Sequence, residues 1–486
     1  MKILFLNPPF QTRFSRTSRS PAVTKGGTLY YPIWLSYAAG VAEREGHDIR
    51  LIDAPAQGLM LEDVFERLSG FEPDLAVIDT STPSIYSDAE TARKIKEKYP
   101  FCFNVLVGTH PSALPEDTLL LNDSIDAVAV GEYDYTITDL AKSLEGASAL
   151  GGVDGLMFKK SGAVIKNKSR AKIENLDELV FVSSVYKKHL NYKNYFFAAA
   201  NYPMVMIITG RGCPFNCFFC VYPQVFHSRR YRGRSAESVV EEFEYIRDNF
   251  PGVREVGIED DCFSADRKRV KEICSLLIEK KIKLKWYCNV RADIDYELLK
   301  LMRRAGCRLV TVGFESGSQA VLDAMHKGMK ASQYLRFARE AKRAGVLVHG
   351  CIMVGNPGDS KKTLEESYEF ARKANCDSMQ FYPLYVYPGT EAYRWAKDKG
   401  YLKTEDFSRW LTPEGLHNCV LDTEGLSSGE MVSLCDYYLK KYHLRPRYLF
   451  MKLIQAFKDP GEGYRSFKSA KVFLTRLSRG QLGRGV

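Results

Sequence analysis

The sequence predicts an α/β protein that begins with a doubly wound parallel sheet, continues into a partial barrel of six βα units and ends in a mainly helical region. Short apolar segments alternate with helical patterns over residues 1–145 and again over 201–400, and this alternation favours parallel sheets. Beyond residue 400 the alternation stops. We therefore expect domains at 1–145 and 201–400, a linker or hairpin at 146–200, and a basic helical region at 401–486.

The first series contains five segments that we expect to be strands buried on both faces. They are short and rich in Ile, Leu and Val, as such strands tend to be. Helical patterns such as 35–45 and 87–98 lie between them. In open sheets of this kind, ligands bind beyond the carboxyl ends of the strands. The five predicted strands are Lys2–Asn7, Asp48–Asp53, Asp74–Asp79, Asn104–Val107 and Ala127–Val130.

The second series contains six predicted strands separated by helices. One helix, Ala236–Asn249, follows Ser235, a favourable N-cap, and carries its apolar residues on one face. Six βα units form a partial barrel, whereas eight would close a full one. The six strands are Met204–Thr209, Glu255–Glu259, Lys285–Cys288, Leu309–Phe314, Val348–Val354 and Ser378–Leu384.

The composition narrows the class of protein further. Of the 486 residues, 45% are hydrophobic and 26% are charged, as in ordinary globular proteins. No window of about 18 apolar residues exists, which excludes a transmembrane helix. The first residues resemble a buried strand more than a secretion signal, and twelve scattered cysteines suggest a reducing compartment. We expect a cytoplasmic protein.

The net charge of +10 is concentrated at the C-terminal end. From Lys440 onward there are twelve Lys or Arg against two acids, so this segment carries the whole excess. Such a segment suits nucleic acid, an anionic membrane or an acidic substrate, or it is simply a solvated surface. No nucleic-acid reading module accompanies it, so we expect no nucleic-acid partner.

An apolar stripe lies within this basic segment. Four of its residues share one helical face at i, i+4, i+5 and i+8, and Lys452 and Lys458 flank that face. A basic amphipathic helix can lie in a membrane interface, and packing of the stripe against the barrel is the competing interpretation. Membrane association through this region is therefore left open. The four residues are Leu449, Leu453, Ile454 and Phe457.

Three cysteines form a C-x3-C-x2-C motif directly after the first strand of the second series. Cys213, Cys217 and Cys220 could wrap one face of an iron–sulfur cube and leave the fourth iron without a protein ligand. An open iron can bind a substrate or cofactor. Structural zinc normally takes four ligands, with His227 the nearest candidate for the fourth. Three buried free thiols are the remaining interpretation.

This motif resembles that of the radical S-adenosylmethionine (SAM) superfamily, and the resemblance covers roughly residues 204–395. It implies a [4Fe–4S] cluster whose open iron chelates SAM, with Phe219 near the adenine. It also implies that Arg291 pairs with the SAM carboxylate and that Glu315 binds the ribose. A surface ion pair is the alternative for Arg291. The implied SAM contacts are Phe219, Glu259, Asp261, Arg291, Glu315 and Ser316.

Two features of the second strand and the first domain qualify the resemblance. Gly257-Ile258-Glu259 stands where the family often has Gly-Gly-Glu, although the acidic turn resembles the cobalamin-binding branch. Residues 1–145 resemble the Rossmann-like cobalamin-binding domain of that branch. Its Asp-x-His-x-x-Gly motif corresponds here to Asp53, Pro55 and Gly58, so no imidazole would ligate cobalt from below.

Further turns at the strand ends resemble the cobalamin site, although Thr109 replaces a glycine of the family pattern. A flavodoxin-like module that binds a nucleotide or nothing is the alternative for this domain. No Gly-x-Gly-x-x-Gly follows the first strand, which disfavours a dinucleotide. The implied cobalamin contacts are Asp53, Pro55, Gly58, Ser81, Thr82, Gly108, His110, Gly131 and Glu132.

The resemblance implies a cobalamin-dependent radical SAM enzyme similar to the branch of the anaerobic Mg-protoporphyrin monomethyl ester cyclase and the hopanoid-associated enzymes. Such enzymes cleave SAM reductively to a 5′-deoxyadenosyl radical and modify an unactivated carbon, and we expect C-methylation. A flavodoxin or ferredoxin would donate electrons, and the substrate would be a small molecule or lipid. No residue is assigned as catalytic.

Three other functions compete. A radical cyclase or ring-contraction enzyme would act on a lipid, isoprenoid or tetrapyrrole. A non-catalytic cobalamin or iron–sulfur sensor would not need the whole set of SAM contacts. A methylthiotransferase would need three further cysteines, but the first 145 residues hold only Cys102.

Overall fold

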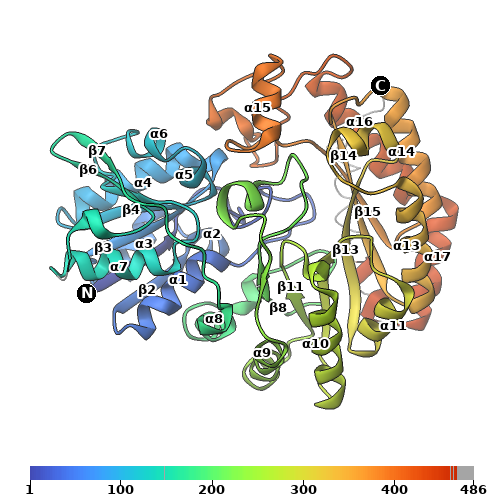
Figure 1. The fold of residues 1–486 in the computed structure, drawn as a ribbon, viewed down its shortest axis with the longest axis horizontal. Helices are drawn as coiled ribbons and strands as arrows, with labels where there is room; N and C mark the ends of the chain where they lie inside the picture. The colour runs from blue at the N-terminus through green and yellow to red at the C-terminus, as the bar shows by residue number, and fades with distance from the viewer. Residues whose placement is uncertain (147, 460, 464, 468–486) are drawn as a thin grey trace.

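The computed structural model describes residues 1–146, 148–459, 461–463 and 465–467. Two β-sheets, each flanked by helices, lie side by side, and the C-terminal helices pack on the far side of the second sheet (Figure 1). This arrangement confirms the predicted α/β fold class. None of the described helices is long and apolar enough to cross a bilayer.

The first sheet has the order β2-β1-β3-β4-β5-β6-β7, and its first five strands are parallel. Its strand order reverses between β1 and β3, the position at which doubly wound sheets bind ligands. Residues 3–6 of the strand beside this position, β1, are fully buried. The five parallel strands are β1 (Lys2–Asn7), β2 (Asp48–Asp53), β3 (Leu75–Thr80), β4 (Phe103–Gly108) and β5 (Ala127–Ala129).

Helices cover both faces of this sheet, and the apolar strands need that cover on each side. The longer ones are α1 (Ile33–Arg44), α3 (Leu61–Arg67), α4 (Ile85–Lys98) and α7 (Asp134–Leu144). Short helical turns follow the strands: α2 (Ala54–Gln57), α5 (Thr109–Ala113) and α6 (Pro115–Leu119). These turns place the predicted cobalamin contacts at the carboxyl edge of the sheet.

A hairpin extends the first sheet beyond residue 145. β6 (Leu156–Lys160) pairs antiparallel with β5, and β7 (Ala163–Lys166) pairs antiparallel with β6. Its two turn residues, Ser161 and Gly162, both have positive φ, as tight hairpin turns require. The hairpin expected at 146–200 therefore belongs to the first sheet, and α8 (Val182–His189) leads on to the barrel. The domain boundaries stay a prediction.

The second sheet contains six parallel strands in the order β15-β14-β13-β12-β11-β8. The strands are β8 (Met204–Ile207), β11 (Glu255–Ile258), β12 (Lys285–Val290), β13 (Cys307–Glu315), β14 (Leu347–Val354) and β15 (Ser378–Pro383). Helices on the outside are α9 (Ala236–Asn249), α10 (Arg267–Glu279), α11 (Tyr296–Arg304), α12 (Gln319–Ala324), α13 (Ala331–Ala344), α14 (Lys361–Ala374) and α15 (Glu391–Asp398). The predicted partial barrel is confirmed.

Residues 8–32 form a long connection between β1 and α1 that we call the interdomain strap. Arg16 is buried in the first domain and donates to Asn7 Oδ1 at 2.7 Å and to Asp88 Oδ1 at 2.6 Å. Arg19, three residues later, donates to the backbone oxygen of Asp260 in the barrel at 2.7 Å. The strap therefore ties the two domains together.

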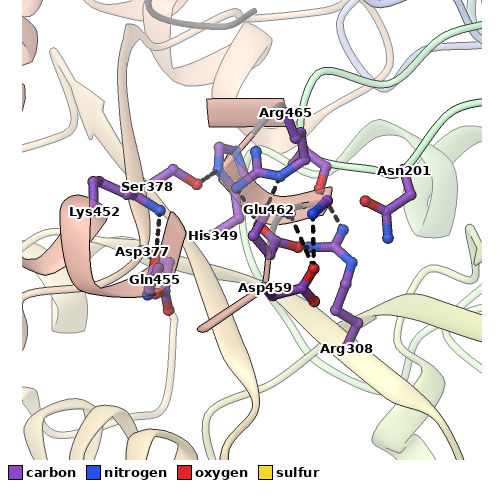
Figure 2. Close-up of polar contacts among 12 residues, drawn as sticks. Asn201, Arg308, His349, Asp377, Ser378, Lys452, Gln455, Asp459, Glu462 and Arg465 are labelled. Carbon is purple, nitrogen blue, oxygen red and sulfur yellow. Dashed lines mark hydrogen bonds and ion pairs between the residues drawn. The ribbon is translucent and has the colours of Figure 1, made fainter. Parts of the chain in front are cut away.

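The C-terminal region packs on the last strand of the barrel and reaches the end at which the strands start. Residues 401–427 are irregular, and α16 (Ser428–His443) then packs on β15 before α17 (Pro446–Lys458). Figure 2 shows Glu462 beside Arg308, with 2.6 Å between Oε1 and Nη1. Arg308 also binds Glu255 at the start of β11, with Nε 2.8 Å from Oε1. This buried ion network joins the C-terminal segment to the strand starts.

Candidate functional site

The three motif cysteines lie on one loop at the carboxyl end of β8. The short strands β9 (Gly210–Arg211) and β10 (Arg232–Gly233) pair antiparallel and clamp the loop at its base. All three thiols are free and partly exposed. Burial raises the pKa of Cys213 to about 12 and that of Cys220 further. Three unpaired thiols on one loop are the ligand type that an iron–sulfur cube takes.

Asp261 holds the base of this cysteine loop. Its Oδ2 accepts from the backbone N–H of Gly212 at 3.0 Å and lies 2.9 Å from His227 Nδ1. Burial opposes ionisation, but the adjoining His227 lowers the pKa of Asp261 overall. Gly212 has φ +85°, and a Cβ there would lie 2.2 Å from the oxygen of Arg230. Asp261, predicted to contact SAM, therefore already supports the loop, and His227 is engaged with Asp261.

Glu259 points into the barrel from the end of β11. Its Oε1 accepts from Tyr287 Oη at 2.9 Å and its Oε2 accepts from Asn289 Nδ2 at 3.0 Å. Gly257 makes this possible, because a Cβ at that position would lie 2.3 Å from Tyr287 Oη. The Arg19 guanidinium reaches to 3.5 Å from Oε2. Glu259 is thus a fixed carboxylate between the two domains.

Arg291 lies against the cysteine loop. Its guanidinium carbon sits 3.9 Å from the ring centroid of Phe215, a cation–π distance. Nη2 donates to the backbone oxygens of Lys327 at 2.5 Å and Gly328 at 2.9 Å. Its nearest carboxylate, Asp293, is 3.9 Å away. The structure therefore places Arg291 at the candidate site and not in a close surface ion pair.

Glu315 ends β13 in a left-handed conformation with φ +64°. The buried ammonium of Lys327 lies 3.0 Å from its Oε1, and Tyr382 Oη is 3.3 Å from Oε2. Lys327 Nζ also lies 5.6 Å from the ring centroid of Phe219. The lysine thus joins two residues that the resemblance assigned to SAM. Ser316 instead turns toward α14, with its Oγ 3.1 Å from Ser367 Oγ.

The motif Asp53–Gly58 forms a single helical turn, α2. Asp53 caps the turn by accepting from Ala56 N at 3.3 Å, Pro55 occupies the first turn, and Gly58 ends it with φ +66°. Asp53 also accepts from Asn7 Nδ2 at 2.8 Å and from Tyr195 Oη at 2.9 Å. Burial raises the pKa of Asp53 to about 6. These residues shape the sheet edge next to the barrel.

Small polar residues line the neighbouring strand ends. His110 is buried with its Nδ1 3.1 Å from Thr82 Oγ1, and burial lowers its pKa to about 3, so the ring is neutral. Ser81 lies beside Ser84, with 2.8 Å between their hydroxyl oxygens. Gly108 has φ +117° and passes so close to β3 that a Cβ would lie 2.3 Å from the oxygen of Thr80. These hydroxyl, imidazole and amide groups suit the polar rim of a corrin.

Glu132 belongs to the contact between the domains. It binds the Arg232 guanidinium through a bidentate pair and lies 3.6 Å from Arg211 Nη1. Burial raises the pKa of Glu132, but Arg232 and Arg211 outweigh it and lower the value to about 2. Gly131 precedes it with φ +76°, and a Cβ there would meet Lys172 Nζ at 2.9 Å. These predicted cobalamin contacts lie against the base of the cysteine loop.

Two side chains at this site, Arg19 and Lys327, were not predicted as site residues, and His227 was considered only as a fourth zinc ligand. Arg19, Lys327 and His227 reach it only because distant segments come together. A hint existed in the regular spacing of Arg13, Arg16 and Arg19 along the strap. A small pocket between the domains is lined by Arg19, Trp34, Tyr222, Glu259 and Asp261, among others. The pocket therefore lies between the strap and the turn after β11, next to the end of the cysteine loop.

Comparison with known proteins agrees with this two-domain arrangement. Residues 19–141 match the B12 binding domain family, and residues 207–371 match the radical SAM superfamily. An uncharacterized methyltransferase of Pyrococcus horikoshii is 30% identical over 457 residues, covering 94% of this chain and 95% of that protein. The anaerobic magnesium-protoporphyrin IX monomethyl ester cyclase of Cereibacter sphaeroides is 27% identical, covering 95% and 76%.

A solved structure shares the fold over the whole chain. It is the radical SAM methyltransferase TsrM of Kitasatospora setae with cobalamin and a [4Fe–4S] cluster bound. Its TM-score is 0.69 at 15% identity, covering 98% of this chain and 99% of that one. The two family matches and the full-length relative together establish the family and its cofactors, a [4Fe–4S] cluster, SAM and cobalamin. The chain belongs to the radical SAM enzymes that carry a B12-binding domain.

Proposed function

We propose that this enzyme methylates an unactivated carbon of a small molecule. The observation that carries the proposal is the contact between the domains, in which Arg19 of the strap binds the turn that supports the cysteine loop, beside a small pocket. A methyl carrier in the first domain could approach a radical formed at the barrel only if the two domains are held side by side in this way. The P. horikoshii relative, which is named a methyltransferase, supports the same reaction.

We assign the cluster to Cys213, Cys217 and Cys220. When bound, the cluster and SAM supply a 5′-deoxyadenosyl radical that removes a hydrogen atom, and cobalamin carries the methyl group. Arg291 is positioned beside the cysteine loop to pair with a carboxylate. Glu315 offers carboxylate oxygens for hydroxyl groups, although Lys327 and Tyr382 already share them.

The chain itself orients these groups and excludes water. Tyr287 and Asn289 hold both oxygens of Glu259, so the carboxylate cannot rotate freely. Phe197 packs on Tyr287 with 5.0 Å between ring centroids, which adds an apolar wall to the barrel interior. A dry, preorganised interior protects a reactive radical from side reactions.

Two exposed parts of the chain suggest partners for the enzyme. The partial exposure of all three cysteines supports access for an electron donor such as flavodoxin or ferredoxin. A peripheral contact of the C-terminal region with a membrane also belongs to this proposal, and α17 would form its surface. The division into domains at 145, 200 and 400 is part of the same interpretation.

Transfer of a labelled methyl group tests the proposal without knowledge of the substrate. The reconstituted holoenzyme is incubated anaerobically with a reductant and SAM labelled in its methyl group. We expect label on the bound cobalamin and S-adenosylhomocysteine as the co-product. Formation of 5′-deoxyadenosine without either product would contradict methylation.

That contrary result would favour a radical cyclase. The similarity to the C. sphaeroides cyclase, which extends over 95% of this chain, is the observation behind this second candidate. A cyclase forms its new bond within the substrate and does not need to transfer the methyl group of SAM. The same assay therefore separates the two reactions.

A further inference from the structure

The outer face of α17 is unusually apolar for a protein surface. Seven of the fourteen large hydrophobic side chains that are exposed in the described part of the chain lie between Leu444 and Phe467. On α17, Leu449, Phe450, Leu453 and Phe457 are exposed, and Phe457 is 86% accessible. Such a dense apolar surface usually marks an interaction site.

The inner face of α17 is anchored to the barrel. Tyr448 Oη donates to the backbone oxygen of Asp377 at 3.0 Å, and Gln455 donates to the Asp377 carboxylate. Lys452, predicted to flank the apolar face, lies on this inner side and donates to Gln455 Oε1 at 2.9 Å (Figure 2). Burial lowers the pKa of Lys452 to about 8. The outward apolar face is therefore held in place by polar contacts behind it.

A groove of about 380 Å³ runs between α17, the end of α13 and the starts of β14 and β15. Leu347, Phe450 and Ile454 contribute apolar walls. Three exposed cations, Lys342, Arg447 and Lys458, also line it. None of the three forms an ion pair with another described residue.

Among the residues that the structure describes, a single acid lines the groove, and its carboxylate already accepts hydrogen bonds from within the protein. Asp377 accepts hydrogen bonds from the backbone N–H of Val348 at 2.9 Å and from Gln455. The charge of the groove is therefore net positive, and its cations are free to meet an anionic ligand. An apolar trough lined by cations matches an amphiphile with a negative headgroup.

We infer that the outer face of α17 and this groove form a docking surface for an anionic phospholipid bilayer. Leu453 and Phe457 enter the interface, while Lys342, Arg447 and Lys458 meet lipid phosphates. Each basic residue close to an anionic membrane is attracted by the negative surface potential of the lipids. The sequence beyond residue 467 contains five further Lys or Arg and no acid, a composition that also favours an anionic membrane.

The position of the groove also sets the orientation of the docked enzyme. The groove lies at the starts of β14 and β15, whereas the cysteine loop follows the carboxyl end of β8, at the other end of the parallel strands. The strand starts would face the bilayer and the cysteine loop would face away from it. Docking through α17 thus localises the enzyme without delivering a bilayer lipid directly to the cysteine loop.

Vesicle flotation of the full-length protein tests this surface, which develops the membrane contact proposed above. Vesicles of phosphatidylcholine with 30% phosphatidylglycerol should carry the protein, and pure phosphatidylcholine should not. Leu453→Glu with Phe457→Glu should reduce the bound fraction at least tenfold. Lys342→Glu with Lys458→Glu should do the same at low salt. Phe101→Glu, which replaces a fully exposed phenylalanine of the first domain, is the matched control and should bind normally.

Unchanged binding by both double variants would overturn the inference even if the wild-type protein floats. Two other results would also overturn it. A wild-type dimer that dissociates in Leu453→Glu with Phe457→Glu would assign the face to a second copy. Binding that appears only after truncation at residue 467 would assign the face to residues 468–486. Thermal melting checks that each variant is folded. Since flotation needs no SAM turnover, its failure would leave the proposed reaction untouched.

Discussion

Arg19 of the first domain donates a hydrogen bond to the backbone oxygen of Asp260 in the barrel, with 2.7 Å between Nη2 and O. The same guanidinium donates to the oxygen of Glu259 at 3.1 Å and approaches the carboxylates of Glu259 and Asp261. One side chain therefore connects the strap to the turn that supports the cysteine loop. Its removal should disturb the alignment of the two domains more than their stability.

Arg19→Ala should lower the rate of methyl-label transfer to cobalamin about tenfold while changing the free energy of unfolding by less than about 1 kcal/mol, because a partly exposed ion pair contributes little. Arg19→Lys should recover only part of the rate, since a point charge cannot make the forked contact. Label-transfer kinetics and chemical denaturation measure both quantities.

Arg13→Ala is the matched control, because Arg13 donates to Gly27 within the strap and not to the barrel. Its label transfer should match that of the wild-type enzyme. Equal rates in Arg13→Ala and Arg19→Ala would show that the link between Arg19 and Asp260 has no role in catalysis.

Replacement of Cys213, Cys217 and Cys220 together by Ala should remove the cluster. The wild-type chain should hold about four irons after anaerobic reconstitution and show the absorption of a [4Fe–4S] centre. The triple variant should show neither, and it should form no 5′-deoxyadenosine. Cys102→Ala, at a buried free thiol of the first domain, should keep the full iron content. Cleavage of SAM by the triple variant would contradict the assignment.

Gly257→Ala should weaken SAM binding. The added methyl group would lie 2.3 Å from Tyr287 Oη, so the tyrosine must move away from Glu259. We expect at least a tenfold increase in the dissociation constant for SAM, measured by calorimetry, and a stability loss of about 1–3 kcal/mol from overpacking. A Cβ added at Gly429 would meet nothing within 4 Å, so Gly429→Ala should leave binding unchanged. Normal SAM binding by Gly257→Ala would show that Glu259 does not contribute to the SAM site.

Asp53 should make stability fall as the pH rises. Burial raises its pKa to about 6 in the folded protein, whereas an unfolded aspartate has a pKa of about 3.9. Between these values the folded state binds more protons, so the Asp53 contribution decreases from pH 4 toward pH 6 and is lost above that range. In Asp53→Asn, the fall in the free energy of unfolding between pH 4 and pH 6 should be smaller by about 1–3 kcal/mol. Denaturation midpoints at several pH values measure it, and parallel profiles for the two proteins would exclude Asp53 as the titrating group.

Local patterns determined much of the architecture. The strands Lys2–Asn7 and Asp48–Asp53 and the helix Ala236–Asn249 have the predicted bounds. Lys2–Asn7 is a continuous apolar run and the helix begins at a capping serine, whereas Asp48–Asp53 is an edge strand whose Asp48 and Arg50 are exposed and not buried as predicted. The cysteine motif is also local, since its three thiols lie within eight residues. Hydrophobic period, capping and short ligand spacing are properties that a single segment carries by itself.

Only the tertiary structure decided what the polar side chains at the site contact. Asp261 and Glu132 were predicted to touch cofactors, but they also hold His227 and Arg232, residues 34 and 100 positions away. Lys327 and Arg19 were not predicted as site residues, because their partners come from other elements. The physical reason is that a buried charge must find its partner in the packed fold. That partner depends on strand order and loop closure, which no local pattern contains.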